Sequence, residues 1–545
     1  MEGAIPAAVA TAARVFGDGT ALAEPDGPQL SYRQLHERAG TVARALAAAG
    51  VAPGDRVAVW SPNTRHWVLG ALGALCAGAT LVPVSTRFTG PEALDVIMRS
   101  DAKALLVADC FLGVDRLAVL RAAAAGYDAS HPERGRSGGC LSRIRLVVRI
   151  PVSAPGTAGA ATPAVAAPAA GAGRVIDWAG LDELADSVPP GRASERAAAV
   201  RPGDVSDILF TSGTTGQSKG AMSSHRQSLA VARAWAECGG LSADDRYLVV
   251  SPFFHSFGYK AGILACLVSG AALMPLPVYD PARVMTLVEA ERITVLPGPP
   301  TVYQTILDHP GRPARDLSSL RLAVTGAASV PVALVERMHR ELSFRTVLTG
   351  YGLTEAVVAT MCRAGDGPHT VARTSGRATA GFEVRIAAPA GHSGEILLRG
   401  PNVMLGYLDD PAATRAAVDP DGWLHTGDVG TLDADGYLTV TDRLTDMYIS
   451  GGFNVYPAEV EQVLARLEGV AEAAVVGVAD DRLGEVGRAY VVTRPGHVLD
   501  ARDVLAFCRD RLANYKVPRQ VEFRAALPRS PAGKTLKRLL REESR

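Results

Sequence analysis

The segment from Thr211 to Gly220 reads TSGTTGQSKG and constrains the chain more than any other. It contains three glycines, five hydroxyl residues and one lysine. Glycines allow positive φ and let backbone N–H groups approach an anion closely, while the hydroxyls and Lys219 add donors and charge. The preceding run from Asp207 to Phe210 predicts a buried strand that enters this loop. The pattern therefore indicates a phosphate-binding loop, with a flexible Gly/Ser turn as the alternative. It is not the Walker type, which needs Gly-Lys followed by Ser or Thr.

Length and charge narrow the class of protein. A chain of 545 residues should contain more than one domain, and 48% hydrophobic residues fit a large buried core. Lys+Arg and Asp+Glu each number 56, so no basic field favours nucleic acid as a partner. We expect no membrane span and no signal peptide. Seven cysteines without a C-x-x-C pair favour a cytoplasmic location.

Helix-like and strand-like patterns alternate in the first part of the chain. Tyr32 to Ala49 has helical spacing, and Trp67 to Ala77 reads as a buried helix. Val57 to Trp60 and Thr80 to Pro83 are short apolar runs typical of strands. Such alternation predicts an α/β domain with a largely parallel sheet.

Two regions break this alternation. Residues from about 151 to 173 are almost entirely Ala, Pro, Gly and Thr, and we expect a flexible surface insertion there. From Asp442 to Asn454 a charged segment and a Gly-Gly turn introduce a different pattern, with a hinge expected near 443–446. Pro457 to Leu464 and Asp500 to Leu512 read as helices, and Ala473 to Val478 and Ala489 to Val492 as strands. We therefore predict a large domain over 1–443 and a small α+β domain over 444–545.

Three further motifs contain residues suited to nucleotide chemistry. Tyr351-Gly-Leu-Thr-Glu355 sets an aromatic ring beside a hydroxyl and a carboxylate that could hold Mg²⁺ together with phosphate oxygens, although it could also be an ordinary helix start. Asp428 could bind ribose hydroxyls with Arg443 nearby, or be a turn residue. Lys534 could deliver a cation to a reaction centre, or lie in an exposed tail.

Taken together and in this order, the motifs resemble those of the adenylate-forming superfamily of acyl- and aryl-CoA synthetases, peptide-synthetase adenylation domains and luciferases. The resemblance runs from Leu30 to Lys534 and so covers nearly the whole chain. It implies a large N-terminal domain with parallel-sheet subdomains and a small, mobile α+β C-terminal domain. It also implies an enzyme that joins a carboxylic acid to ATP, releases pyrophosphate, and then transfers the acyl group to CoA.

The same resemblance implies a role for each matching residue. The phosphates would be held by Thr211, Ser212, Gly213, Thr214, Thr215, Gly216 and Lys219, and the adenine by Gly326, Ala327, Ala328 and Tyr351. Thr354 would contact the α-phosphate and Glu355 would hold Mg²⁺. Asp428 and Arg443 would bind the ribose. Lys534 would act in adenylation, and Gly451 and Gly452 would line the CoA channel. ATP, Mg²⁺ and CoA are the implied cofactor and co-substrates.

The segment from Pro252 to Gly258 (PFFHSFG) corresponds to the acyl-binding region of the family. His255 would stand at the pocket entrance beside the carboxylate, with Phe254, Phe257 and Gly258 in the pocket wall. Lys260 is a candidate donor to a substrate carbonyl, but a lysine there is more often solvent-facing.

Within the superfamily, several stretches resemble actinobacterial ligases that attach CoA to the propanoate side chain left on the C and D rings of steroids. They include PFFHSFGYKAGILACL from Pro252 and MYISGGFNVYPAEVEQVLAR from Met447. A medium- or long-chain fatty acyl-CoA synthetase is the alternative. A stand-alone protein that loads a carrier domain and a non-catalytic nucleotide-binding protein are others. The expected partners are a small carboxylic acid, ATP and CoA, with a homodimer possible.

One position departs from the family pattern. The hinge residue two places after Arg443 is usually Asp or Lys, whereas here it is Thr445. A β-branched residue is stiffer at χ1, so domain rotation should be slower or differently balanced, unless any small residue suffices there.

We predict that Thr445→Lys alters the thioester-forming step more than adenylation. The two half-reactions can be measured separately, as pyrophosphate release without CoA and as CoA consumption from preformed acyl-adenylate. Equal effects on the two rates would contradict the prediction.

Overall fold

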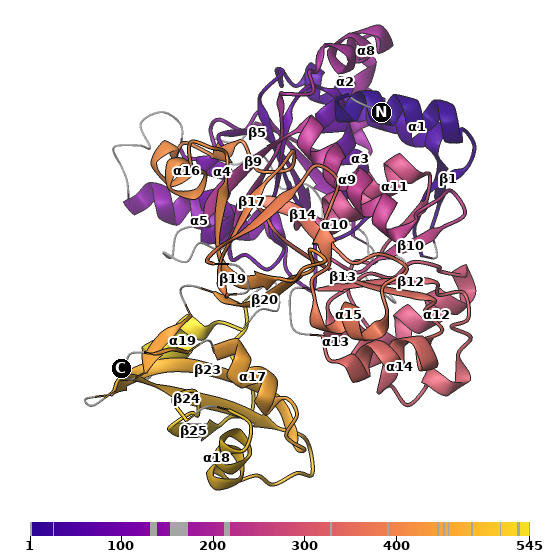
Figure 1. Cartoon of the computed structure of the whole chain (residues 1–545). Helices are drawn as coiled ribbons and strands as arrows, with labels where there is room; N and C mark the ends of the chain where they lie inside the picture. The colour runs from indigo at the N-terminus through magenta and orange to yellow at the C-terminus, as the bar shows by residue number, and fades with distance from the viewer. Residues whose placement is uncertain are drawn as a thin grey trace. The chain divides into compact units, whose positions relative to one another are not determined.

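A computed structural model describes residues 3–543 with internal gaps. The gaps are at 26, 131–138, 153–172, 212–217, 327–329, 390–391, 444–445, 451–452, 456, 481–482, 513 and 531–534, and the side chains of 442, 443, 449, 453 and 454 are also outside the description. The chain divides into two compact units (Figure 1). Unit 1 comprises 1–382 and 399–420, and unit 2 comprises 383–398 and 421–545. The grouping assigns part of the predicted N-terminal domain to unit 2, and the predicted boundary at 443/444 stays a prediction.

The largest sheet of unit 1 has eight strands in the order β18-β9-β8-β4-β3-β5-β6-β7. From β8 to β7 all neighbours are parallel, whereas β9 and β18 add antiparallel edges. The strands are β3 (Arg56–Trp60), β4 (Thr80–Pro83), β5 (Ala102–Ala108), β6 (Leu146–Ile150), β7 (Arg174–Asp177), β8 (Val205–Thr211), β9 (Lys219–Ser224) and β18 (Gly406–Tyr407).

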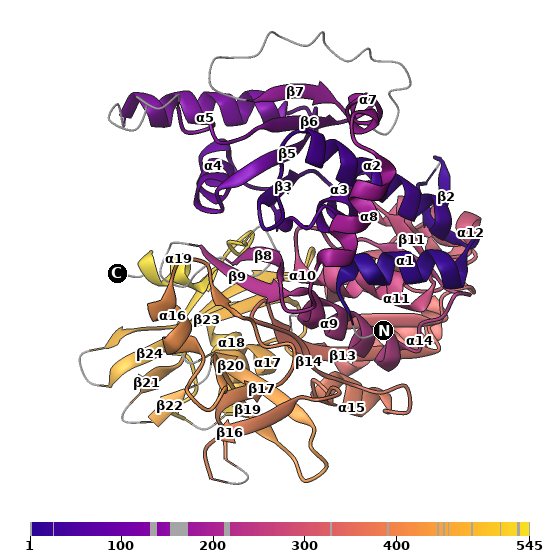
Figure 2. The same ribbon diagram turned by 90° about the horizontal axis from the view of Figure 1, so that it is seen from above.

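Helices cover both faces of this sheet. Val57 and Val59 of β3 pack in one apolar cluster with α2 (Tyr32–Ala48) and α3 (Arg65–Cys76). Ala58 and Trp60 pack in another with α4 (Gly90–Arg99) and α5 (Arg116–Ser130). Figure 2 shows α2 and α3 on one side of β3 and β5, and α4 on the other. Both faces are buried, which explains why these strands are continuous apolar runs.

Two further sheets of unit 1 lie in the orders β10-β11-β1-β2 and β12-β13-β14-β15. Val295 joins them through bridges to Tyr247 of β10 and Leu322 of β12. Their strands are β1 (Thr20–Ala23), β2 (Gln29–Ser31), β10 (Arg246–Val249), β11 (Ala272–Pro275), β12 (Leu322–Gly326), β13 (Thr346–Leu353), β14 (Ala356–Met361) and β15 (Arg377–Ala378). The remaining helices of unit 1 are α1 (Ile5–Phe16), α7 (Gly180–Asp186), α8 (Pro190–Ala199), α9 (His225–Gly239), α10 (Ser256–Gly258), the π-helix η1 (Tyr259–Leu264), α11 (Ala265–Ser269), α12 (Pro281–Glu291), α13 (Pro300–Leu307), the 3₁₀ turn η2 (Arg312–Ala314), α14 (Val332–Leu342), α15 (Pro368–Arg373) and α16 (Pro411–Ala417).

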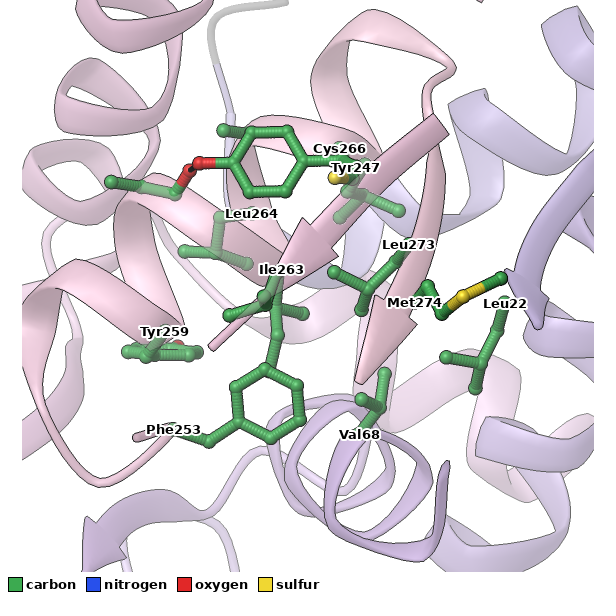
Figure 3. Close-up of a cluster of buried hydrophobic side chains, with 14 of the residues drawn as sticks. Leu22, Val68, Tyr247, Phe253, Tyr259, Ile263, Leu264, Cys266, Leu273 and Met274 are labelled. Atoms are coloured by element: carbon green, nitrogen blue, oxygen red, sulfur yellow. Dashed lines mark hydrogen bonds between the residues drawn. The ribbon is translucent and has the colours of Figure 1, made fainter. Parts of the chain in front are cut away.

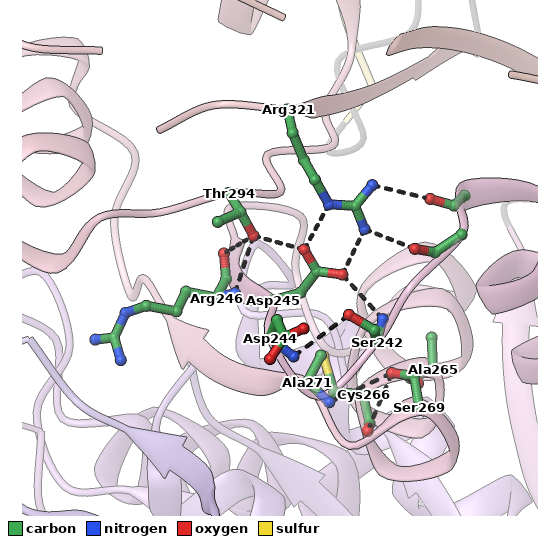
Figure 4. Close-up of polar contacts among 12 residues, drawn as sticks. Ser242, Asp244, Asp245, Arg246, Ala265, Cys266, Ser269, Ala271, Thr294 and Arg321 are labelled. Carbon is green, nitrogen blue, oxygen red and sulfur yellow. Dashed lines mark hydrogen bonds and ion pairs between the residues drawn. The ribbon is translucent and has the colours of Figure 1, made fainter. Parts of the chain in front are cut away.

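A buried carboxylate connects the starts of these strands (Figure 4). Asp245 is 2% exposed and lies just before β10. Its Oδ1 accepts hydrogen bonds from Arg321 Nε at 2.6 Å and from Thr294 Oγ1 at 2.8 Å. Arg321 also donates to the carbonyl of Gly240 at the end of α9. These bonds fix where β10 and β12 begin relative to α9, because a buried charge needs its full set of partners.

Unit 2 contains two sheets. One has the order β16-β17-β19-β20, and the other β22-β21-β24-β23 with β25 paired to β24. The strands are β16 (Glu383–Ala387), β17 (Gly394–Arg399), β19 (Leu424–Leu432), β20 (Leu438–Arg443), β21 (Tyr448–Ser450), β22 (Phe453–Val455), β23 (Val470–Asp480), β24 (Gly484–Thr493) and β25 (Gln520–Phe523). The helices are α17 (Pro457–Leu464), α18 (Ala501–Arg509) and α19 (Lys537–Glu542).

The predicted elements are confirmed with small changes at their ends. The helix expected from Tyr32 is α2, which a Ser31 capping box begins. The strand expected to enter the phosphate loop is β8, and the helix expected from Pro457 is α17. The fold class is confirmed as a large α/β unit and a small α+β unit. None of the helices in the described parts of the chain has the length and apolar character needed to cross a bilayer.

Two histidines of unit 1 are held uncharged. Burial lowers the pKa of His225 and of His66 to about 4. His225 begins α9, and its Nδ1 accepts a hydrogen bond from the Ile5 backbone N–H at 3.3 Å. In the unfolded chain these histidines take up protons near pH 6.5, whereas in the folded chain they do so only near pH 4. The free energy of unfolding therefore decreases as the pH falls from 6.5 to 4.

We predict that lowering the pH from 7 to 5 reduces the free energy of unfolding by about 2 kcal/mol for each of these two histidines. Urea denaturation at the two pH values measures the loss. In His225→Gln the pH-dependent loss should be smaller by about the same amount. An unchanged difference between pH 7 and pH 5 in that variant would contradict the assignment.

Candidate active site

The predicted phosphate loop connects two antiparallel strands of a hairpin. Thr211 of β8 pairs with Lys219 of β9, and residues 212–217, which include Ser212 to Gly216, lie outside the described residues. Arg99, at the end of α4, donates to the Ser218 carbonyl at 2.7 Å, and its guanidinium lies 5.2 Å from the Phe210 ring centroid. Arg99 thus holds the backbone of Ser218 in place, and this fixes the position from which the side chain of Lys219 extends.

Two of the predicted adenine residues, Gly326 and Tyr351, lie at the ends of neighbouring parallel strands. Gly326 ends β12 and pairs with Gly350 of β13, the residue before Tyr351. Ala327 and Ala328 lie outside the described residues. The carboxyl ends of neighbouring parallel strands are where α/β proteins place ligand-binding loops. The register therefore brings together two segments that the sequence separates.

Thr354 and Glu355 occupy a tight turn between β13 and β14, so the alternative of a helix start is wrong. A Cβ on Gly352 would lie 2.5 Å from the Val358 backbone nitrogen, so a larger residue there would displace the turn. Thr354 and Glu355 thus lie in the turn of the β13–β14 hairpin, at the same end of β13 as Tyr351.

Tyr407 of β18 connects the carboxylate to the loop lysine. Its hydroxyl donates to Glu355 Oε1 at 2.7 Å, and Lys219 Nζ lies 5.0 Å from its ring centroid. Burial, with a contribution from Glu355, raises the pKa of Tyr407, which keeps the hydroxyl protonated and able to donate. The ring face attracts the ammonium group, so a single residue holds one cation and one anion.

The segment before His255 is anchored by a residue that is distant in the sequence. Asn63 is buried, and its side chain donates to the Ser251 carbonyl at 2.9 Å and accepts from the Phe253 N–H at 2.8 Å. His255 Nδ1 accepts the N–H of Phe257 at 3.2 Å and so begins α10. In the tautomer that this bond requires, the proton is on Nε2.

The imidazole of His255 keeps access to solvent, while the surrounding protein desolvates it and lowers its pKa below the usual value. At neutral pH both features favour a neutral ring that donates through Nε2–H. Phe254 and Phe257 are half-buried. The Phe257 ring packs edge-on against the Trp235 ring, with 4.8 Å between the ring centroids. A Cβ on Gly258 would lie 2.2 Å from the Pro252 carbonyl, so only glycine fits.

Lys260 does not lie where the sequence suggested. Its side chain is 1% exposed and forms an ion pair with Asp207 of β8 at 2.9 Å. It is therefore neither solvent-facing nor available to a substrate carbonyl, because its charge is already used inside the core.

Asp428 and Arg443 are brought together in unit 2. They face each other across strands β19 and β20, so the alternative of a turn residue is wrong for Asp428. Asp428 is 4% exposed, and its N–H donates to Thr426 Oγ1 at 3.1 Å. The side chain of Arg443 lies outside the described residues, as do Thr445, Gly451, Gly452 and Lys534.

Three residues of this arrangement were missed by the sequence analysis, namely Arg99, Asn63 and Tyr407. Their partners lie 119, 188 and 52 residues away in the chain. None of the three stands in a motif with a characteristic spacing, so no local pattern could have identified them.

Comparison with known proteins agrees with this geometry. Residues 9–408 match the family of AMP-binding enzymes, and residues 459–534 match the C-terminal domain of AMP-binding enzymes. The chain belongs to the AMP-binding enzyme family. The 3-[(3aS,4S,7aS)-7a-methyl-1,5-dioxo-octahydro-1H-inden-4-yl]propanoyl:CoA ligase of Rhodococcus jostii is 57% identical over 99% of this chain and 98% of its own. A Mycobacterium tuberculosis protein of the same name is 54% identical over the same shares.

Solved structures give the same result for the fold. The ATP-bound crystal structure of MatB from Rhodopseudomonas palustris is 28% identical, with a TM-score of 0.79 over 99% of this chain and 98% of its own. Both units of the chain are therefore covered by one known architecture.

The residues present fit a magnesium ion bound with a nucleotide. Among the described residues, no group of three or more His, Cys, Asp or Glu side chains could hold a metal ion. Mg²⁺ binds instead through one or two carboxylates together with substrate phosphates. Glu355 would supply one such carboxylate, and Tyr407 donates a hydrogen bond to one of its two oxygens.

We predict that Tyr407→Phe raises the Mg²⁺ concentration needed for half-maximal AMP formation by about tenfold, because Glu355 loses a charge-assisted hydrogen bond. AMP release at varied Mg²⁺ measures this change. Tyr279→Phe is a matched control, since the Tyr279 hydroxyl donates to the Val302 carbonyl at 2.9 Å. The same Mg²⁺ dependence in both variants would contradict an orienting role for Tyr407.

Proposed function

We propose that the protein is an ATP-dependent acid–CoA ligase that acts through an acyl-adenylate on a bicyclic propanoate from steroid breakdown. The observation that carries this proposal is the 57% identity, over 99% of the chain, to a ligase named for the 7a-methyl-1,5-dioxo-octahydroindenyl propanoyl group. Similarity of this extent includes the acyl-binding segment and not only the nucleotide motifs.

The proposed reaction has two steps. A carboxylate oxygen of the acid attacks the α-phosphorus of ATP, the bond to the bridging oxygen breaks, and pyrophosphate leaves with the electron pair. The thiol of CoA, after loss of its proton, then attacks the acyl carbon, and AMP leaves. No general base is needed in the first step, because a carboxylate is ionised at neutral pH.

The described residues would bind and align ATP in the first step. Gly326 and Tyr351 would hold the adenine, Thr354 the α-phosphate, and Lys219 with Thr211 the outer phosphates. Glu355 would hold Mg²⁺, which offsets phosphate charge when bound. In unit 2, Asp428 and Arg443 would bind the ribose.

His255 would orient the acid. A neutral imidazole with its proton on Nε2 can donate one hydrogen bond to a carboxylate oxygen without neutralising it by proton transfer. Phe254, Phe257 and Gly258 would contact the apolar part of the acid. Lys534 would neutralise charge as the anions meet, and Gly451 and Gly452 would line the passage for CoA.

The alternative, a fatty acyl-CoA synthetase, would need an acid-binding pocket of a different shape. A fatty-acid site should accept acids of graded chain length, whereas a two-ring pocket loses contacts with a flexible chain that leaves it half empty. A cytoplasmic location and a homodimer stay predictions.

We predict that AMP forms in a CoA-dependent manner with the bicyclic propanoate and at least about tenfold more slowly with straight-chain acids. The measurement is AMP release with ATP and Mg²⁺, with and without CoA, over both acid panels. Lys534→Ala should lose adenylation by about a hundredfold or more, while Lys537→Ala is the matched control, because Lys537 pairs with Glu461 at 2.8 Å.

Turnover of straight chains alone would refute the ring acid and keep the ligase. Adenylation without thioester formation would indicate another acceptor, such as a carrier domain. Nucleotide binding without turnover of any acid would favour a non-catalytic protein.

A further inference from the structure

A fully buried charge cluster lies beneath the proposed phosphate loop. Asp207 is 0% exposed, and its Oδ2 accepts hydrogen bonds from Ser206 Oγ at 2.6 Å and from Ser228 Oγ at 2.7 Å. Its Oδ1 pairs with Lys260 Nζ at 2.9 Å, and the same ammonium donates to Ser223 Oγ at 2.8 Å. Three secondary elements and the π-helix η1 therefore share one set of polar contacts.

The two partners of Lys260 stand opposite each other in the loop hairpin. Asp207 of β8 and Ser223 of β9 form a cross-strand pair, and Thr211 with Lys219 forms the pair at the base of the loop. Four residues of strand, roughly 13 Å, separate these two pairs. Lys260 thus binds both strands of the hairpin at once, at a fixed distance below the loop.

Lys260 also belongs to the segment that contains the proposed acid-binding residues. It lies in η1, which begins directly after α10, and Lys260 itself is five residues after His255. A π-helical turn is rare and frequent at functional sites. Here Lys260 contacts the hairpin, while its neighbours Tyr259 and Ala261 pack in the apolar core.

The rest of η1 is fixed in the apolar core. Figure 3 shows Ile263 and Leu264 among the side chains of β10 and β11, such as Tyr247 and Leu273. The Tyr247 hydroxyl donates to the Ala261 carbonyl at 2.8 Å, which satisfies a backbone acceptor of the π-helix. One side of η1 is thus held in the apolar core, and Lys260 connects η1 directly to both strands of the hairpin.

We propose that the Asp207–Lys260 pair is a positioning element that sets the acid-binding segment in register with the phosphate-binding loop. The inference rests on the proposed function of both segments. The Asp207–Lys260 ion pair and the Lys260–Ser223 hydrogen bond hold the ammonium group at one place between β8 and β9, whereas apolar contacts are not directional, so the pair fixes one relative placement of η1 and the hairpin. An error of about 1 Å between two reacting groups can reduce a rate about a hundredfold. Neither residue touches a reactant, so both act through His255 and Lys219.

The test uses the full chain and three variants. Lys260→Met leaves Asp207 buried without its cation, and Arg321→Met is the matched control, because it does the same to Asp245 away from the proposed site. The double variant Asp207→Leu with Lys260→Met removes both charges. Replacing a buried pair by apolar residues is often neutral or stabilising, so the double variant should remain folded. Ser206 and Ser228 can then bond to each other, as their oxygens are 3.1 Å apart.

Thermal unfolding and the two half-reactions are measured for each protein with the bicyclic propanoate. The double variant should unfold near the midpoint of the unmodified chain and still lose about tenfold or more in the adenylation rate. Its rate of thioester formation from preformed acyl-adenylate should change much less. Arg321→Met should lower the unfolding midpoint and leave the adenylation rate per folded molecule unchanged.

Adenylation at the unmodified rate in a folded double variant would overturn the inference, because the pair would then serve stability alone. An equal fall in both half-reactions would overturn it as well. If the unmodified chain forms no AMP with any acid, the proposed function fails first, and the inference that rests on it falls with it.

Discussion

The buried carboxylate of Asp207 constrains how the elements of unit 1 are arranged near the loop hairpin of β8 and β9. A charge at 0% exposure is stable only when donors and an opposite charge replace the water that it has lost. Two serine hydroxyls donate to Oδ2 and one ammonium group forms an ion pair with Oδ1, and these groups come from β8, α9 and η1. Because the positions of these elements are tied to one charge, the loop hairpin and the segment after His255 are set by the same contact.

The candidate nucleotide-binding residues lie where parallel strands end and turns begin. Gly326 and Tyr351 are at the carboxyl ends of β12 and β13, and Glu355 follows in the turn to β14. Such ends are the places where backbone changes direction and side chains can leave the sheet. The residues that hold other candidate segments in place come instead from other loops and helix ends, as Asn63 does for the segment before His255 and Arg99 does for Ser218.

Local patterns predicted the elements of the chain well, because periodicity and capping act over a few residues. The helix from Pro457 and the strand from Thr80 have the predicted bounds, and the motif order implied the family. Contacts between distant segments have no local signature. Lys260 therefore read as a surface lysine, although its partner Ser223 lies 37 residues away and the pair is buried. Asp428 taken alone is more often a turn residue, since nothing near it in the sequence shows that β20 pairs with β19.

Tyr407 shows how the candidate site keeps opposite charges apart. Among the described residues, Lys219 and Glu355 form no ion pair with each other, and the tyrosine lies between them with its ring toward one and its hydroxyl toward the other. A direct pair would leave the lysine less able to attract a phosphate and the carboxylate less able to bind a metal ion. The interposed ring holds both groups by weaker contacts, so each keeps most of its charge for a ligand. A site that must bind an anion and a cation together gains more from this separation than from an extra salt bridge.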